Sequence, residues 1–204
     1  MSGRIIIGIL SDFFSWRWAL GFIGILSMLA SILFYCLLPP SKHFQPRPPE
    51  ISKLVQSMFN HLKNPGLLCL FGISFFNMGS FISLYNYISY HLMAPPYSLS
   101  QSMVGFIFII YLVGTFSSTF MGRLADKHGR HMILRISLLI LASGAITTLT
   151  ALLWLKIVGI ALVTFGFFGT HSVASSWVGY HATCNKAQAS SLYLFFFYTG
   201  TSIG

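Results

Sequence analysis

Charged side chains are scarce in this sequence, at 7% of 204 residues, whereas 55% of the residues are hydrophobic. A soluble globular protein carries roughly 25% charged residues, so this inventory could not cover a soluble surface. Acidic residues are the rarer of the charged residues, since the chain has only Asp12, Glu50 and Asp126 but twelve Lys and Arg. The composition excludes an ordinary soluble domain and predicts an all-α protein that lies in a lipid bilayer.

Cysteine and catalytic motifs are scarce as well. Cys36, Cys69 and Cys184 form no CxxC pair and have no nearby His at metal-ligand spacing, so we expect reduced, structural cysteines, no metal site and no cofactor. The sequence has no HExxH, no GxSxG and no paired aspartates within an apolar run, which argues against an enzyme. Met1 is followed by neither a basic segment nor a small-residue cleavage site, so no signal peptide is expected.

The formal net charge of +9 raises the question of a nucleic-acid partner. Most of the basic residues gather in two short clusters between long apolar runs, whereas a nucleic-acid surface interleaves Lys and Arg with polar and aromatic side chains. The charge therefore indicates membrane topology, and no nucleic-acid partner is expected.

The gaps between charged residues predict the membrane spans, because a helix needs about 20 apolar residues to cross the hydrocarbon. We expect five complete spans, at 18–38, 66–92, 102–122, 136–155 and 157–185. Two shorter apolar runs, 1–11 and 187–204, indicate partial spans. This pattern predicts a fragment of a longer polypeptide.

Basic residues also predict which connections face the cytoplasm. They concentrate in the connection from Pro39 to Pro65 and in a loop at 123–135, whereas the hinge at 94–101 has no charge and the turn at 155–157 has only Lys156. The positive-inside rule places the first two connections in the cytoplasm and the last two outside. Within the first, residues 50–64 have apolar side chains at helical spacing, which indicates an amphipathic helix at the membrane surface or, alternatively, a simple tether.

One cytoplasmic segment carries a recognisable motif, with its signature residues at Gly122, Asp126, Lys127, Gly129 and Arg130. It resembles the G-x-x-x-D-[RK]-x-G-[RK]-[RK] signature of the major facilitator superfamily, with His131 in place of the last basic residue. The charges can hold the segment at the cytoplasmic face, and Gly129 can supply a turn. We interpret the motif as a latch that stabilises one conformation over another.

The start of the chain shows a second resemblance to this superfamily. Residues 3–8 and 11–18 are similar to the end of the fifth helix and the start of the sixth in bacterial efflux members, with Arg4 and Ile7 as departures. The resemblance implies that 1–38 holds partial helix 5 and helix 6, that 39–65 is the central loop, and that 66–204 is the C-terminal half with helices 7 to 10 and partial helix 11.

The resemblance further implies a secondary transporter of the bacterial inner membrane, of the arabinose-efflux type, that moves small organic solutes by alternating access. Protons are a further candidate partner, and a monomer is expected for the full-length protein. A non-functional truncated product, or a membrane structural protein without transport activity, is the alternative.

Polar residues within apolar spans are costly and usually face a cavity or a partner helix, so they are the candidates for solute binding. In the span at 66–92, the side chains of Ser83, Asn86, Tyr87 and Tyr90 fall toward one face and can supply amide and phenol hydrogen bonds. The full candidate set is Arg4, Asn77, Ser83, Asn86, Tyr87, Tyr90 and His171. The alternative for His171 is a hydrogen-bonded interior residue, and the alternative for Arg4 is a structural pairing near the start of an ordered helix. An aromatic membrane belt is the alternative for Tyr90.

Overall fold

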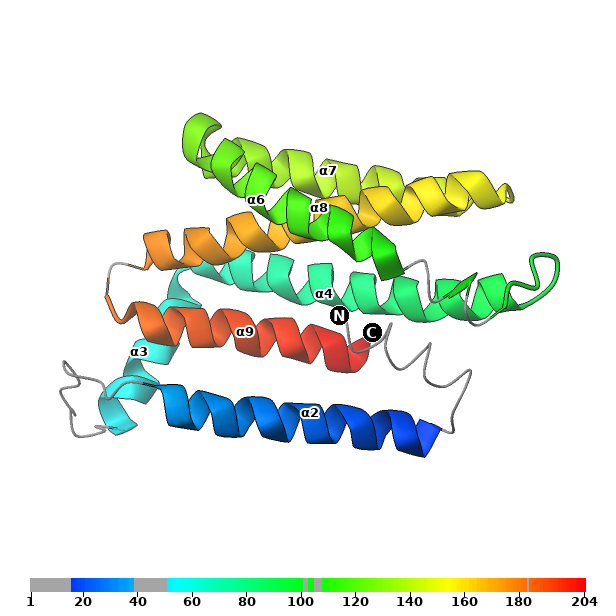
Figure 1. The fold of residues 1–204 in the computed structure, drawn as a ribbon. Coiled ribbons are helices and arrows are strands. Elements are labelled where there is room, and N and C mark those ends of the chain that lie inside the picture. Colours follow the sequence, from blue (N-terminus) through cyan, green and yellow to red (C-terminus); the bar gives the residue numbers. More distant parts are fainter. Residues whose placement is uncertain (1–15, 39–50, 101–102, 105–107, 183) are drawn as a thin grey trace. The chain divides into compact units, whose positions relative to one another are not determined.

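The computed structural model describes residues 16–38, 51–100, 103–104, 108–182 and 184–204. The elements, in chain order, are α2 (Trp16–Leu37), α3 (Ile51–Lys63), α4 (Pro65–Met93), the short 3-10 helix η1 (Phe108–Ile110), α6 (Tyr111–His128), α7 (Arg130–Thr148), α8 (Leu153–His181) and α9 (Lys186–Ile203). The described residues contain helices and turns without a strand, which confirms the predicted all-α fold (Figure 1).

The chain divides into two compact units, and α2 belongs to the first, which comprises Met1–Pro49 with Leu99–Phe108. Nearly all of the described side chains of α2 are exposed, and its segment Leu20–Leu37 has a mean hydropathy of 2.3. A helix that is apolar on every side and exposed on every side suits a hydrocarbon environment.

The second unit, formed by Glu50–Ser98 and Ile109–Gly204, is a bundle built around α8. Helix α8 packs against α7, α6, α4 and α9, while α9 also packs along α4 (Figure 1). The core includes Phe71 of α4, Ile133 of α7, Val173 of α8 and Leu192 of α9. The amphipathic helix expected at 50–64 is present as α3, and its Met58 and Leu62 pack against this core.

Glycines bring α7 and α8 into close contact. A Cβ atom added to Gly144 would lie 2.6 Å from the backbone nitrogen of Val163, and one added to Gly166 would lie 2.5 Å from that of Leu141. Small residues allow backbones to approach in this way, which is the main source of helix association in lipid. The α7–α8 pair is therefore a tightly packed element of the bundle.

Four helices are long and apolar enough to cross a membrane, in the segments Leu20–Leu37, Pro65–Met93, Arg130–Thr148 and Leu153–His181. They confirm four of the five expected complete spans, with shifted ends. Asn64 fixes the start of α4, since its side-chain oxygen accepts from the backbone nitrogens of Gly66 at 3.0 Å and Leu67 at 3.3 Å.

The boundaries expected for the span at 102–122 are wrong. Helix α6 begins at Tyr111, after the 3-10 turn, and continues to His128, six residues beyond the expected end. The apolar run ends at Arg123, but helical hydrogen bonding does not, because basic side chains are favourable beside the free carbonyl groups of a helix C-terminus.

The expected loop at 123–135 and the expected turn at 155–157 also require correction. Only Gly129, with a φ of 92°, interrupts the helical backbone between α6 and α7, and Arg130 already begins α7. Lys156 lies in the first turn of α8 and is buried, instead of marking an exposed turn. In both places the charged residue sits inside a helix end, so charge positions misplace the boundary by several residues.

Candidate functional site

Two of the candidate residues, Ser83 and Tyr87, open onto a groove with a volume of about 760 Å³. One wall is α4, and the other walls are the turn after α4 and the connection between α7 and α8. The remaining lining residues are Ser80, Leu84, Ile88, His91, Pro96, Tyr97, Ala145, Thr148, Leu149, Ala151 and Lys156. The volume lies within the usual range for small-molecule sites, and its polar groups are hydroxyls, an imidazole and an ammonium.

Asn86 and Tyr90 lie on the exposed surface of α4 and are not among the residues that line this groove. Tyr90 is 75% exposed, as an aromatic residue at a membrane interface would be. The four polar residues expected on one face of the helix are thus divided between a groove and the open surface.

Asn77 is buried between α4 and α8, where its Nδ2 donates to the carbonyl oxygen of Phe167 at 3.3 Å. Its Oδ1 is also buried and accepts no hydrogen bond from the described residues. A buried amide with one bond joins two helices at the cost of an unpaired acceptor. The structure therefore gives Asn77 a contact between helices instead of a position in the groove.

His171 of α8 is half-buried and lies against α9. Its Nδ1 is 3.1 Å from the hydroxyl of Tyr193, and its ring centroid is 4.7 Å from that of Phe197. The partner of His171 could not be expected from the sequence, because Tyr193 lies 22 residues away on the next helix. The structure thus separates His171 from the groove residues, and Arg4 falls outside the described residues.

The groove also contains residues that the sequence did not single out as site candidates, namely Lys156, His91 and Tyr97. Lys156 was interpreted only as a topology marker, and the other two lie near the expected hinge. The sequence did contain a signal, since Lys156 is a lone charge between two long apolar runs, 136–155 and 157–185, and membrane helices must accommodate such a charge.

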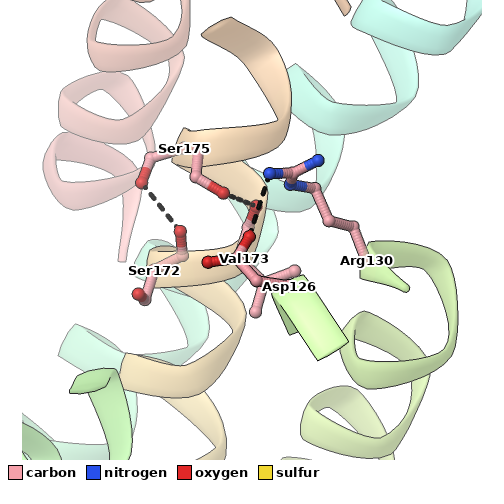
Figure 2. A network of polar contacts seen from close by, with 6 residues as sticks. Asp126, Arg130, Ser172, Val173 and Ser175 are labelled. Atoms are coloured by element: carbon pink, nitrogen blue, oxygen red, sulfur yellow. Dashed lines mark hydrogen bonds and ion pairs between the residues drawn. The ribbon is translucent and has the colours of Figure 1, made fainter. Parts of the chain in front are cut away.

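The motif residues form a separate cluster at the opposite end of α7, shown in Figure 2 with the α8 turn that holds Ser172, Val173 and Ser175. Asp126 of α6 pairs with Arg130 of α7, with 3.0 Å between Oδ1 and the guanidinium nitrogen. The Arg130 guanidinium also lies over the ring of Tyr180 in α8, at 4.7 Å from its centroid. Asp126 is thus paired with a neighbouring cation, and the cluster connects three helices.

Gly122 and Gly129 have distinct geometric roles in this motif. A Cβ atom on Gly122 would lie 3.3 Å from Oγ of Ser172, whose hydroxyl donates to the carbonyl oxygen of Ser118 at 3.0 Å. Gly129 adopts a φ of 92° and a ψ of 136°, a region open almost only to glycine. Lys127 is exposed. The glycines thus place α6 against α8 and set the turn between α6 and α7.

Among the described residues, no group of three or more His, Cys, Asp or Glu side chains could hold a metal ion. The groove offers hydroxyls, one imidazole, aromatic rings and one buried ammonium.

A model of the Major Facilitator Superfamily matches residues 1–204, the whole chain. The chain belongs to the major facilitator superfamily. It is 51% identical over 201 residues to the Uncharacterized MFS-type transporter YybF of Bacillus subtilis, covering 98% of this chain and 50% of that protein. No solved structure matches the chain.

Two further relatives extend the comparison. The Inner membrane transport protein YnfM of Escherichia coli is 43% identical over 203 residues, which is 100% of this chain and 49% of that protein. An Uncharacterized transporter of Buchnera aphidicola subsp. Schizaphis graminum is 48% identical over 202 residues, 99% of this chain and 49% of that protein. The chain spans about half the length of the curated relatives it matches.

Proposed function

We propose that this chain is part of a secondary transporter that moves small organic solutes across the bacterial inner membrane by alternating access, in the direction of efflux. The observation that carries the proposal is the superfamily match over residues 1–204, combined with an ion-paired motif at Asp126 and Arg130. The printed names of the relatives, which include a transport protein of the inner membrane, support the same cellular location.

The geometry of the motif supports its role as a conformational latch. The Asp126–Arg130 pair and the contact of Arg130 with Tyr180 connect the ends of α6, α7 and α8. Alternating access requires groups of helices to move against each other about a solute site, so contacts that hold only one arrangement set the balance between the two states. The latch would act on the rate of that change and not on which solute binds.

The solute contacts in this proposal come from the polar and aromatic surface of α4. Ser83 and Tyr87 line the groove, and Asn86 and Tyr90 lie on the exposed surface of the same helix. Amide, hydroxyl and phenol groups suit a solute with several hydrogen-bonding groups and an apolar or planar body. Arg4 stays in the proposed set, whereas Asn77 joins α4 to α8 and is not proposed as a solute contact.

Proton coupling is a further part of the proposal, and His171 is the candidate for it among the described residues of the spans, because the expected spans contain no Asp or Glu. The pairing of His171 with Tyr193 places a titratable imidazole between α8 and α9, where a change of protonation would alter a contact between two helices.

The test is a transport assay on the full-length protein that carries this chain, reconstituted in proteoliposomes and presented with a panel of sugars, organic acids and cationic drugs. We expect at least one solute class to move above the rate of empty liposomes, and an imposed pH gradient to change that rate. Asn86→Ala and Arg4→Ala should reduce the flux while membrane insertion is retained. Unchanged flux in both variants would refute the proposed solute contacts, and no flux for any solute would refute the transporter.

A further inference from the structure

Lys156 is a cation that the bundle buries, with 6% of its surface exposed. Its Nζ donates to the carbonyl oxygen of Thr148, the last residue of α7, at 2.9 Å. An ammonium has three donors, so one hydrogen bond to a neutral carbonyl leaves most of its bonding capacity unused. The side chain therefore needs a further partner, and a buried charge normally has one of opposite sign.

The described residues do not supply that negative charge. Their one acid is Asp126, which pairs with Arg130 at the opposite end of α7. The 19-residue helix from Arg130 to Thr148 is roughly 28 Å long. The free carbonyl groups at the end of α7 contribute only about half of an elementary charge, so a net positive charge remains at Lys156.

The groove beside Lys156 has an aromatic wall. The rings of Tyr87 and His91 are stacked, with centroids 5.7 Å apart and an interplanar angle of 11°, and His91 meets the ring of Tyr97 edge-on at 5.6 Å. The Nζ of Lys156 is 5.9 Å from the centroid of Tyr97. Tyr97 is held in place because its hydroxyl donates to the carbonyl oxygen of Ala151.

These groups run from α4 to the α7–α8 connection along one groove of about 760 Å³. We infer that Lys156 binds the carboxylate of a small organic acid whose planar or apolar body lies along Tyr87, His91 and Tyr97. The ammonium supplies charge and hydrogen bonds, and the rings supply an apolar surface of the size that a drug-like molecule buries.

This inference rests on the proposed transporter and adds to it a solute class and an orienting residue. Alternation of the spans places Lys156 at the external end of the bundle. Organic acids would therefore meet this site as they approach from, or depart toward, the outer face of the membrane.

The test is a binding measurement by calorimetry on the purified full-length protein that contains this chain. The probes are benzoate and its neutral isostere benzamide, with hexanoate and hexanamide as the matched aliphatic pair. We expect each acid to bind at least about tenfold more tightly than its amide, because a charge-assisted hydrogen bond is lost with the carboxylate. Lys156→Gln should remove this preference and Lys156→Arg should keep it.

A second variant is needed because Lys156→Gln also removes the contact of Lys156 with the end of α7, and the loss of that contact could distort the groove by itself. Tyr87 lies on α4, so the substitution Tyr87→Leu leaves the contact between Lys156 and Thr148 unchanged. It should reduce the preference for benzoate over hexanoate while both acids still bind more tightly than their amides. Equal affinity of acid and amide in the unmodified protein, or a preference that survives Lys156→Gln, would overturn the inference.

An internal counter-ion would give a different pattern. If Asp12 or Glu50 neutralises Lys156 in the full-length protein, the unmodified protein would show no preference for acids, and Asp12→Asn or Glu50→Gln would create one. That result would also overturn the inference. Transport separates the two proposals. Flux of any solute above the rate of empty liposomes, together with equal binding of acid and amide, supports the transporter and refutes the acid site, whereas acid binding without flux of any solute does the reverse.

Discussion

Asp126 and Arg130 form an ion pair of 3.0 Å that spans the junction between α6 and α7. Asp126 lies in the last turn of α6, Arg130 is the first residue of α7, and Gly129 forms the turn between the two helices. The guanidinium also contacts the ring of Tyr180, so that a single side chain joins the motif to α8. The motif is thus a three-helix contact and not an isolated charged loop.

Asp126→Asn should lower the transport rate by up to about fivefold and leave the ranking of solutes unchanged. The substitution keeps the shape of the side chain but removes its charge, and a largely exposed ion pair contributes about 1 kcal/mol or less. Asp126 is 72% exposed, which places it in this range. The measurement is initial flux in proteoliposomes for several solutes, with Arg123→Gln, at an exposed residue of α6 outside the motif set, as the matched control. A changed solute ranking would contradict the latch.

Gly129→Ala should destabilise the protein by about 1–3 kcal/mol, because its φ of 92° and ψ of 136° lie in a region that a side chain disfavours. Thermal unfolding in detergent measures the change. Gly72→Ala is the matched control, since an added Cβ there meets no atom within 4 Å. Equal stability of the two variants would show that the turn does not depend on glycine.

The approximate positions of the spans could be predicted from the sequence, since apolar length and the N-terminal signal at Asn64 and Pro65 are local properties. The ends that failed are those where a cation lies inside a helix, as Arg130 and Lys156 do. Local patterns cannot show that the last carbonyl group of α7, on Thr148, accepts a hydrogen bond from Lys156 of the next helix. That contact depends on the tight turn between α7 and α8.

The candidate site was less predictable than the fold for a related reason. Helical spacing gave Ser83 and Tyr87 a common face, but the packing of α7 and α8 decides where the groove ends and leaves Asn86 outside it. The contact of His171 with Tyr193 joins two helices through side chains, and no local pattern in the sequence encodes such a pair.

Gly166→Ala should destabilise the bundle by about 1–3 kcal/mol, since the new methyl group would lie 2.5 Å from the backbone nitrogen of Leu141 and 2.7 Å from its Cα. Backbone atoms cannot move aside as a flexible side chain can, so α7 and α8 must separate. Gly179→Ala on the same helix is the control, because its Cβ meets no atom within 4 Å. The readout is thermal unfolding in detergent, and a neutral Gly166→Ala would contradict the close α7–α8 contact.

Tyr193→Phe should cost about 1 kcal/mol of stability, because it removes the hydroxyl that lies 3.1 Å from Nδ1 of His171 and keeps the ring. Tyr198→Phe, on the exposed surface of the same helix, should be neutral. Unfolding in detergent compares the two. If both variants unfold at the temperature of the unmodified protein, the contact does not hold α8 and α9 together.

Ser57→Ala should loosen α3 from the bundle. The Nδ2 of Asn185 donates to Oγ of Ser57 at 2.9 Å and links α3 to the turn between α8 and α9, where Asn185 adopts a φ of 47°. The substitution leaves the Asn185 amide without its acceptor, at a cost of about 1 kcal/mol, so amide hydrogen exchange in α3 should become about fivefold faster. Ser52→Ala changes an exposed serine of the same helix and serves as the control. Unchanged exchange in Ser57→Ala would mean that Met58 and Leu62 alone hold α3 on the core, by their apolar contacts.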